Sequence, residues 1–182
     1  MPDLRNSPQM PNEAGNRKRV VISGAGPAGL LTAGLLLERN NEQGPVTYEV
    51  TLVDGRDDYG AFSKEELQKN HRSWMLGLAD HGMDAIKTLP DLYENYVKGE
   101  GIRVKKFNMY LGKKKYGGDA SSDETVENFI VDRNFIVAAL AKFVKETHTK
   151  NENYTALYNT KCLYVDYENK RMLVRDVKTN VE

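Results

Sequence analysis

A strand that runs through closely spaced glycines into a helix constrains this chain more than any other feature. The sequence Arg19-Val-Val-Ile-Ser-Gly-Ala-Gly-Pro-Ala-Gly29 places a β-branched apolar segment directly before three glycines with the spacing G-x-G-x-x-G. Residues 30–39 follow without a break and have helix-forming composition. In this context the glycine pattern predicts a βαβ unit that binds a dinucleotide. A glycine-rich turn that binds no ligand is the alternative.

Each glycine has its own expected role in such a loop. Gly24 permits the tight turn, Gly26 lets the backbone approach a pyrophosphate, and Gly29 lets the helix pack closely on the strand. The amide groups at the start of the helix, where the helix dipole is positive, then face the phosphates. We therefore predict that the cofactor is bound by Gly24, Gly26 and Gly29.

A second strand, expected at residues 48–53, supplies an acid that strengthens this prediction. The strand ends in Asp54, whose carboxylate is placed to hold the hydroxyls of an adenosine ribose. The acid follows Gly29 later than is usual, and the polar insert at residues 40–47 accounts for the delay. The two parallel strands and the helix between them form a right-handed unit.

Composition limits the partners and the compartment that we expect. The chain has 182 residues, enough for one domain with its own core, and 26 basic residues balance 26 acidic ones. A net charge of zero gives no overall attraction to nucleic acid or to an anionic membrane. Cys162 is the only cysteine in the sequence, which excludes an internal disulfide and fits a cytoplasmic protein. The longest apolar run, residues 25–37, is too short to span a membrane.

The rest of the sequence predicts an α/β domain over residues 19–182, after a disordered polar tail at residues 1–18. The last hairpin is followed at once by the end of the sequence, so we expect the domain to be incomplete at its C-terminus. Asp80 and Asp132 are the expected N-caps of two helices. The expected elements are a helical turn at 64–68, an extended segment at 72–79, helices at 81–89 and 91–97, a strand at 102–111, a turn at 112–115, a loop at 117–123, a strand at 129–131, an amphipathic helix that covers a sheet at 133–147, a third parallel strand at 154–158, and a hairpin of strands 161–167 and 171–177.

Three separated segments carry a resemblance to a known family. They are the glycine loop with Asp54-Gly-Arg56, the stretch Arg72-Ser-Trp-Met-Leu-Gly-Leu-Ala-Asp-His-Gly82, and Val131-Asp-Arg-Asn-Phe-Ile-Val137. In this order they resemble the N-terminal half of the FAD-dependent aromatic monooxygenases, most closely the kynurenine 3-monooxygenases. The resemblance runs from residue 19 to about residue 165. It implies a Rossmann-type FAD-binding domain with a parallel sheet, a helical crossover and a small β-hairpin or meander, apparently truncated.

The resemblance implies FAD as the cofactor, with NADPH or NADH as the expected co-substrate. It assigns Pro27 and Ala28, with the three glycines, to the pyrophosphate loop of the family. It assigns Asp54 and Arg56 to the acid and the arginine that follow the second strand of the family. It also implies a backbone contact to the cofactor at Gly77, a side-chain contact at Arg133, and a backbone contact near the adenine at Cys162. Ordinary surface charge for the two arginines, and simple packing for Gly77 and Cys162, are the alternatives.

The resemblance implies a small aromatic substrate, but these residues do not favour kynurenine itself. Phe107 stands where the kynurenine enzymes have an arginine that holds the substrate carboxylate. Lys105 or Lys106 replaces that arginine only with a shift in register, and Tyr116 falls near the substrate tyrosine of the family. Two later motifs of the family, an Asp-Gly pair and a Gly-Asp pair followed by proline, are absent. Gly118-Asp119-Ala120 imitates the second, and we expect it to be a turn.

Two other functions fit part of the sequence. Tyr110 and Lys114 have the Tyr-x-x-x-Lys spacing of the short-chain dehydrogenases, but Gly112 between them favours a hairpin over the helix that this pair requires. A non-catalytic or vestigial dinucleotide-binding module fits a chain that lacks the later motifs. In a flavin monooxygenase the cofactor carries the chemistry, so no catalytic side chain is assigned. The three histidines are too scattered in the sequence to predict a metal site or a catalytic triad.

Overall fold

A parallel sheet forms the centre of the computed structural model, which describes residues 16–41, 46–104, 106–119, 129–148 and 152–182. Its strands are β1 (Arg17–Ser23), β2 (Thr47–Val53) and β8 (Tyr154–Leu157), in the order β1-β2-β8. The prediction of three parallel strands is therefore confirmed. β1 begins at Arg17, inside the segment expected to be a tail, and residues 1–15 lie outside the described residues.

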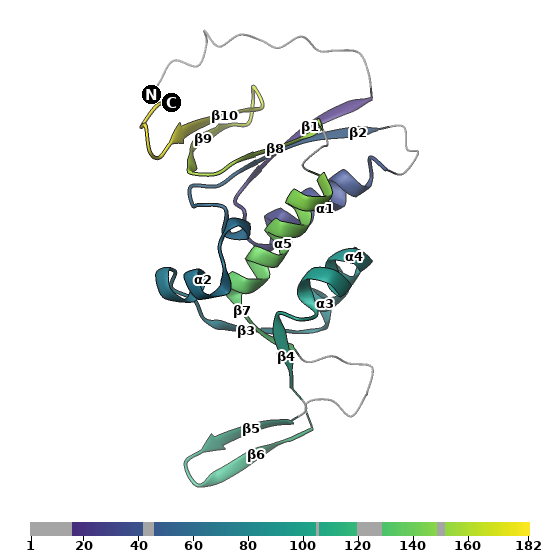
Figure 1. The fold of residues 1–182 in the computed structure, drawn as a ribbon, viewed down its shortest axis with the longest axis vertical. Helices are drawn as coiled ribbons and strands as arrows, with labels where there is room; N and C mark the ends of the chain where they lie inside the picture. The colour runs from purple at the N-terminus through teal and green to yellow at the C-terminus, as the bar shows by residue number, and fades with distance from the viewer. Residues whose placement is uncertain (1–15, 42–45, 105, 120–128, 149–151) are drawn as a thin grey trace.

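Helix α1 (Pro27–Glu38) packs against this sheet, and helix α5 (Arg133–His148) packs beside α1 (Figure 1). In α1, Gly34 lies against Phe143 of α5, because a Cβ at Gly34 would be 3.3 Å from that ring. One turn later, Glu38 lies 3.3 Å from His148. Residue numbers rise in both helices from the first contact to the second. The two helices are therefore parallel, and their amino ends lie on the same side of the molecule.

Helix α5 begins where the sequence predicts and is more deeply buried than it predicts. The backbone N–H of Asn134 donates to Asp132 Oδ1 over 2.7 Å, so Asp132 is the expected N-cap. The residues of its expected apolar face, Ile136, Leu140, Phe143 and Val144, are all buried, but so are Val137, Ala138, Ala139 and Ala141 on other faces. Burial is therefore not confined to the single apolar face expected of an amphipathic helix, because α5 packs against α1, η2 (Tyr59–Ala61) and η3 (Tyr93–Val97).

Short helical elements follow β2, and the helical crossover expected at residues 81–97 is present as a second group of helical elements. Ser63 caps α2 through a capping box with Glu66, whose carboxylate accepts from the Ser63 amide over 2.8 Å. The prediction of Asp80 as an N-cap is wrong by one residue: Ala79 is the N-cap, in an extended conformation, and Asp80 is already in the first turn. The helical elements are η2 (Tyr59–Ala61), α2 (Lys64–Asn70), α3 (Asp80–Lys87), α4 (Pro90–Leu92) and the π-helical turn η3 (Tyr93–Val97).

A second, antiparallel sheet contains β3 (Met75–Leu78), β7 (Phe129–Asp132) and β4 (Gly101–Arg103), in the order β3-β7-β4. The strand expected at residues 102–111 is divided, because β4 pairs with β7 whereas β5 (Lys106–Leu111) pairs with β6 (Lys114–Asp119). The expected turn is shorter than predicted, since Lys114 already pairs with Leu111. The expected loop at 117–123 is a strand as far as Asp119, and residues 120–128 lie outside the described residues.

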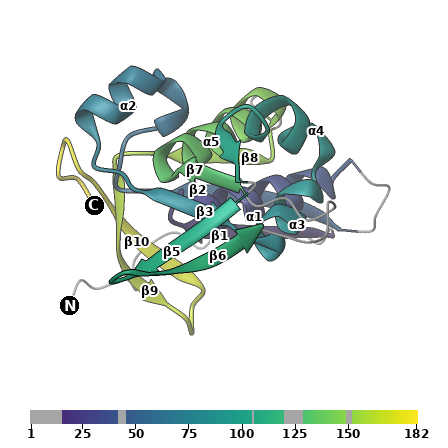
Figure 2. The same cartoon turned by 90° about the horizontal axis from the view of Figure 1, so that it is seen from below.

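The predicted C-terminal hairpin is confirmed as β9 (Thr160–Asp166) and β10 (Arg171–Asp176). It is attached to the end of β2 by backbone hydrogen bonds. The amide of Thr160 donates to Asp54 O over 2.9 Å, and the amide of Asn159 donates to Arg56 O over 2.9 Å. Figure 2 shows β9 and β10 at the left and bottom of the view, away from α3, α4 and α5. The segment after β2 is therefore held between the sheet and the hairpin.

Candidate functional site

The glycine loop has the geometry that a tight strand-to-helix turn requires. Gly24 has a φ of +111°, which side chains rarely allow, and its amide donates to Val53 O over 2.7 Å. A Cβ at Gly29 would lie 2.0 Å from the carbonyl oxygen of Gly24, so only glycine permits this contact of helix and strand. A Cβ at Gly26 would meet nothing within 4 Å. The loop thus has two glycines that the fold requires and one that leaves open space beside the backbone.

The start of α1 offers free amide groups next to that space. Gly26 is the N-cap, with φ −80° and ψ 177°, and no side chain caps the helix. Pro27 occupies the first turn, where its missing N–H costs nothing. The first amides of a helix have no acceptor inside it, and there is no acidic residue in this first turn. An anion placed here would meet these amides and the positive end of the helix dipole.

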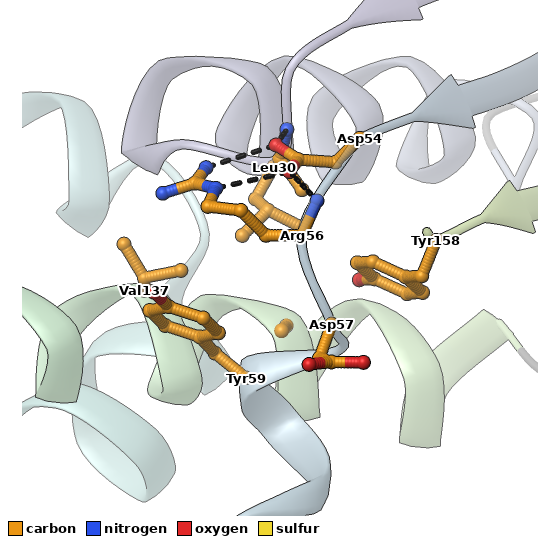
Figure 3. A pocket seen from close by; sticks show the side chains of 9 residues that line it. Leu30, Asp54, Arg56, Asp57, Tyr59, Val137 and Tyr158 are labelled. Carbon is orange, nitrogen blue, oxygen red and sulfur yellow. Dashed lines mark hydrogen bonds and ion pairs between the residues drawn. The ribbon is translucent and has the colours of Figure 1, made fainter. Parts of the chain in front are cut away.

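Asp54 lies directly against the loop (Figure 3). Its Oδ2 accepts from the amide of Ala25 over 2.6 Å and from Arg56 Nη2 over 2.8 Å. Its Oδ1 accepts from the amide of Arg56 over 2.8 Å and from Arg56 Nε over 3.0 Å. Since the side chain is only 7% exposed, this carboxylate is a buried group that joins the end of β2 to the glycine loop.

These bonds keep Asp54 ionised. Burial acts to raise its pKa, but the hydrogen bonds from the Arg56 side chain and from the amides of Arg56 and Ala25 outweigh that effect and lower the pKa below its usual range. The same side-chain bond raises the pKa of Arg56. A carboxylate has about four acceptor positions, and two donors reach each oxygen here. A further donor must therefore displace one of the Arg56 bonds.

The pocket around Asp54 is closed by its own side chains. Arg56 lies over the ring of Tyr59, with its guanidinium carbon 5.4 Å from the ring centroid. Tyr158 lines another wall, and burial raises the pKa of its phenol. The pocket, which also includes Leu30 and Val137, has no room for a water molecule in this conformation. The Arg56 side chain, which is 40% exposed, lies between Asp54 and solvent.

The remaining residues expected to hold the cofactor lie on three other elements. Arg133 is the first residue of α5, so it lies at the same end of the paired helices as the glycine loop, and its guanidinium stacks 4.8 Å above the Trp74 ring. Gly77 is exposed on β3 opposite Ile130, and a Cβ there would meet nothing within 4 Å. Cys162 is partly buried in β9, two residues after the bond that ties Thr160 to Asp54.

The structure does not bring the expected substrate residues to the glycine loop. Tyr116 is 47% exposed on β6, opposite Met109, in a hairpin that extends away from the parallel sheet (Figure 1). Phe107 lies in β5, opposite Gly118, and Lys105 lies outside the described residues.

Tyr110 and Lys114, the pair with dehydrogenase-like spacing, also lie in this hairpin. Tyr110 is on β5, opposite Lys115, and Lys114 is on β6, opposite Leu111, so the two residues lie on different strands and not along one helix. The sequence-based preference for a hairpin here is confirmed. The geometry that a Tyr-x-x-x-Lys dehydrogenase needs is not present.

Sequence reasoning missed three groups at the Asp54 pocket: the Ala25 amide, the Tyr59 ring and the Tyr158 phenol. A signal existed for Tyr158, because it follows β8, and ligands of open α/β sheets bind at the carboxyl ends of the strands. Tyr59 follows Arg56 by one helical turn, but nothing in the residue types indicated a stacked pair. The amide contact depends on the exact turn of the loop, which the sequence pattern does not specify.

Comparison with solved structures reveals the same fold in several flavoproteins. PqsL from Pseudomonas aeruginosa, solved with 2-aminobenzoylacetate, aligns with a TM-score of 0.59 and 18% identity over 87% of this chain and 38% of its own. A second structure describes PqsL as a probable FAD-dependent monooxygenase. The p-nitrophenol 4-monooxygenase PnpA from Pseudomonas putida aligns with a TM-score of 0.53 and 16% identity, over 82% of this chain and 34% of its own.

This chain has the fold of FAD-dependent monooxygenases. CtdE, solved in complex with FAD, aligns with a TM-score of 0.57 and 12% identity over 87% of this chain and 36% of its own. The expected fold class, an α/β fold with a parallel sheet like that of Rossmann-type FAD-binding domains, is confirmed. The chain spans well under half the length of these neighbours, and the closer resemblance to kynurenine 3-monooxygenases stays a prediction. No family model and no curated protein matches the sequence.

Within the described ranges, none of the helices combines the length and the apolar character needed to cross a membrane. The same part of the chain contains no group of three or more His, Cys, Asp or Glu side chains arranged to hold a metal ion.

Proposed function

We propose that this chain is the FAD-binding portion of a flavin-dependent monooxygenase that hydroxylates a small aromatic substrate with NAD(P)H and oxygen. The observation that carries the proposal is the hydrogen bond from the Ala25 amide to Asp54 Oδ2, 2.6 Å long. It places the acid at the end of β2 beside the glycine loop, as recognition of an adenine dinucleotide requires. The shared fold with PqsL, PnpA and CtdE supports FAD over other dinucleotides.

The residues present fit the adenosine diphosphate part of FAD. The open space at Gly26 and the uncapped amides at the start of α1 suit a diphosphate. Asp54 would hold the ribose, and Cys162 on the attached hairpin would lie toward the adenine. Gly77, with open space beside its backbone, and Arg133, at the amino end of α5, would contact the cofactor farther along.

Arg56 regulates access to Asp54 in this proposal. The arginine bonds both carboxylate oxygens, so a ribose hydroxyl replaces one of its bonds and leaves the charge of Asp54 balanced by the other. The exchange costs little, since a partly exposed arginine regains hydrogen bonds to water. Arg56 is thereby a positioning residue, which keeps the carboxylate oriented and ionised before the hydroxyl arrives.

When bound, FAD would supply the redox chemistry, taking a hydride from NAD(P)H and transferring one oxygen atom of O₂ to the aromatic ring. The residues of this chain bind and orient the cofactor and exclude water from the Asp54 pocket. No side chain is assigned a catalytic role, and the substrate contacts predicted for Lys105, Phe107 and Tyr116 remain proposals.

The test is a titration of the purified chain with FAD and, separately, with NAD, followed by flavin fluorescence and by thermal unfolding. We expect saturable quenching of the flavin and a higher unfolding temperature with FAD, and little response to NAD. Stabilisation by NAD alone would overturn the proposal in favour of a nicotinamide protein.

A non-catalytic dinucleotide-binding module is the second candidate, favoured by the short span of the chain relative to its neighbours. It predicts the same FAD binding without turnover. Consumption of NADPH coupled to hydroxylation of an added phenol, at a rate above that of free FAD, would exclude this candidate.

A further inference from the structure

A second cavity lies between α2, η3 and α5, away from the Asp54 pocket. It has a volume of about 220 Å³. On α5 it is lined by Phe135, Ala138 and Lys142, whereas Val137 and Ala141 face the Asp54 pocket. The two cavities therefore share no lining residue and occupy different faces of the same helix. Nothing in the proposed FAD site accounts for this second space.

Aromatic rings form the walls of this cavity, and small residues leave it open. Phe62, Tyr96 and Phe135 line it, and Ala138 and Ala139 of α5 lie between them, where larger side chains would fill the space.

The Tyr96 ring has a fixed position in this wall. Its hydroxyl donates to Glu146 Oε2 over 2.7 Å, and its ring meets Phe143 edge to face at 5.5 Å. The hydrogen bond to Glu146, aided by burial, raises the pKa of Tyr96 to about 12, so the phenol is neutral. The aromatic wall is therefore preorganised to stack against a planar ring.

The residues that line the cavity include two lysines, Lys64 and Lys142, and one glutamate, Glu100, which leaves one excess positive charge. Lys64 forms an ion pair with Glu100 over 2.9 Å and lies 5.4 Å above the Phe135 ring. Lys142 has no ion pair recorded among the residues that the structure describes, so its ammonium is the charge that remains to be balanced. One ammonium beside an aromatic cavity is complementary to one carboxylate on an aromatic ring.

We propose that this cavity binds a small aromatic monocarboxylate, with its ring among Phe62, Tyr96 and Phe135 and its carboxylate at Lys142. The size is adequate, since an engineered protein cavity of about 150 Å³ already binds benzene. The site is independent of FAD binding, and its test does not require the chain to be an enzyme.

The test is an NMR titration of the full ¹⁵N-labelled chain with sodium benzoate, with benzyl alcohol as the uncharged control. We expect saturable amide shifts at Lys64, Tyr96, Phe135 and Ala139, and tighter binding of benzoate than of benzyl alcohol. Equal affinity for the two compounds would remove the role of Lys142, and the absence of saturable shifts at these residues would overturn the site.

Three variants separate the parts of the proposal. Lys142→Gln should weaken benzoate binding by about two- to fivefold, as expected for a partly exposed charge pair, and leave benzyl alcohol unchanged. Lys69→Gln, the same change on α2 outside the cavity, should bind benzoate as the wild type does. Ala139→Leu should abolish binding by filling the cavity, with the unliganded spectrum as the check of folding. Wild-type affinity in both Lys142→Gln and Ala139→Leu would contradict the proposal.

Discussion

The glycine loop and the β5–β6 hairpin differ in how firmly their neighbours hold them. In the loop, Gly24 is bonded to β2, Ala25 is bonded to Asp54, and Gly29 is packed directly on the Gly24 carbonyl. In the hairpin, Leu111 is 70% exposed and Tyr110 is 65% exposed, and the strands recorded for it are paired with each other. The loop is therefore a backbone structure fixed by contacts, whereas the hairpin presents side chains to solvent.

This difference explains which sequence-based predictions can be relied on. A position that requires glycine for steric reasons leaves a mark in the sequence, because no other residue fits. A side chain on an exposed hairpin has no such constraint, since a shift of register exchanges its face at small cost. The cofactor residues of the loop are accordingly better founded than the substrate residues of the hairpin.

The largest expected effect is that of Gly29→Ala. The new Cβ would lie 2.0 Å from the carbonyl oxygen of Gly24, so helix and strand must separate. We expect a loss of about 3 kcal/mol or more in the free energy of unfolding, measured with urea. The matched control is Gly77→Ala on β3, where the Cβ meets nothing, and a change within about 0.5 kcal/mol is expected. Equal effects of the two changes would mean that the loop is not constrained as described.

Asp54→Asn should have the next largest effect. The amide side chain loses the charge that balances Arg56 and presents N–H groups to buried donors, which costs about 2 kcal/mol of stability. Because the folded-state pKa of Asp54 is lowered, its contribution is fully present above the unfolded value of 3.8 and is lost as the pH falls through the folded value. Acid unfolding curves of wild type and variant should thus converge at low pH; a constant difference down to the lowest pH would argue against this linkage.

A smaller dependence of stability on pH is expected from His148, at the carboxyl end of the α1–α5 pair. Its cause is burial of the imidazole and not hydrogen bonding to the charged form, as at Asp54. His148 is 2% exposed, and its Nε2 has no hydrogen-bond partner within the described residues. Burial lowers its pKa below 6.5, and the nearby Glu38 carboxylate only partly offsets this. The folded state therefore resists protonation, and stability should fall as the pH drops below about 6.5.

The check is urea unfolding at pH 7.5 and 5.5. The wild type should lose stability between these values, and His148→Gln should lose less, because glutamine does not titrate. An identical loss in the variant would assign the pH dependence to other groups.

The smallest expected effect belongs to the hairpin. Tyr116→Ala should change the free energy of unfolding by less than about 0.5 kcal/mol, because the side chain is 47% exposed. It should also leave FAD affinity unchanged, as measured by flavin fluorescence. A clear loss of FAD binding would show that the hairpin contacts the cofactor, and would contradict the difference described between the glycine loop and the hairpin.

Much of the fold follows from local sequence signals. The G-x-G-x-x-G spacing located β1, the loop and α1, and Asp132 located the start of α5. The division of the strand expected at residues 102–111 could not be predicted, because β4 pairs with β7, a segment more than 25 residues away in the chain. The deep burial of α5 likewise depends on the packing of α1 and η2 around it, which its own apolar pattern does not reveal.

The candidate site shows the same limit. Asp54 and Arg56 were identified from their position after β2, but their bond to each other was not. An Asp and an Arg two residues apart in a loop have many relative orientations, and the buried one is selected by the Ala25 amide and the Tyr59 ring. An orientation that is selected by tertiary contacts cannot be predicted from residue type or spacing.

Gly26→Ala is the most direct test of the central claim, that the loop backbone is open to a diphosphate. Its φ of −80° suits alanine and its Cβ position is empty, so unfolding by urea should be unchanged within about 0.5 kcal/mol. The methyl group would occupy the space assigned to the phosphates, so FAD affinity should fall roughly tenfold or more, about 1.4 kcal/mol. Unchanged stability with weakened FAD binding is the predicted result. Unchanged stability with wild-type FAD binding would contradict the account.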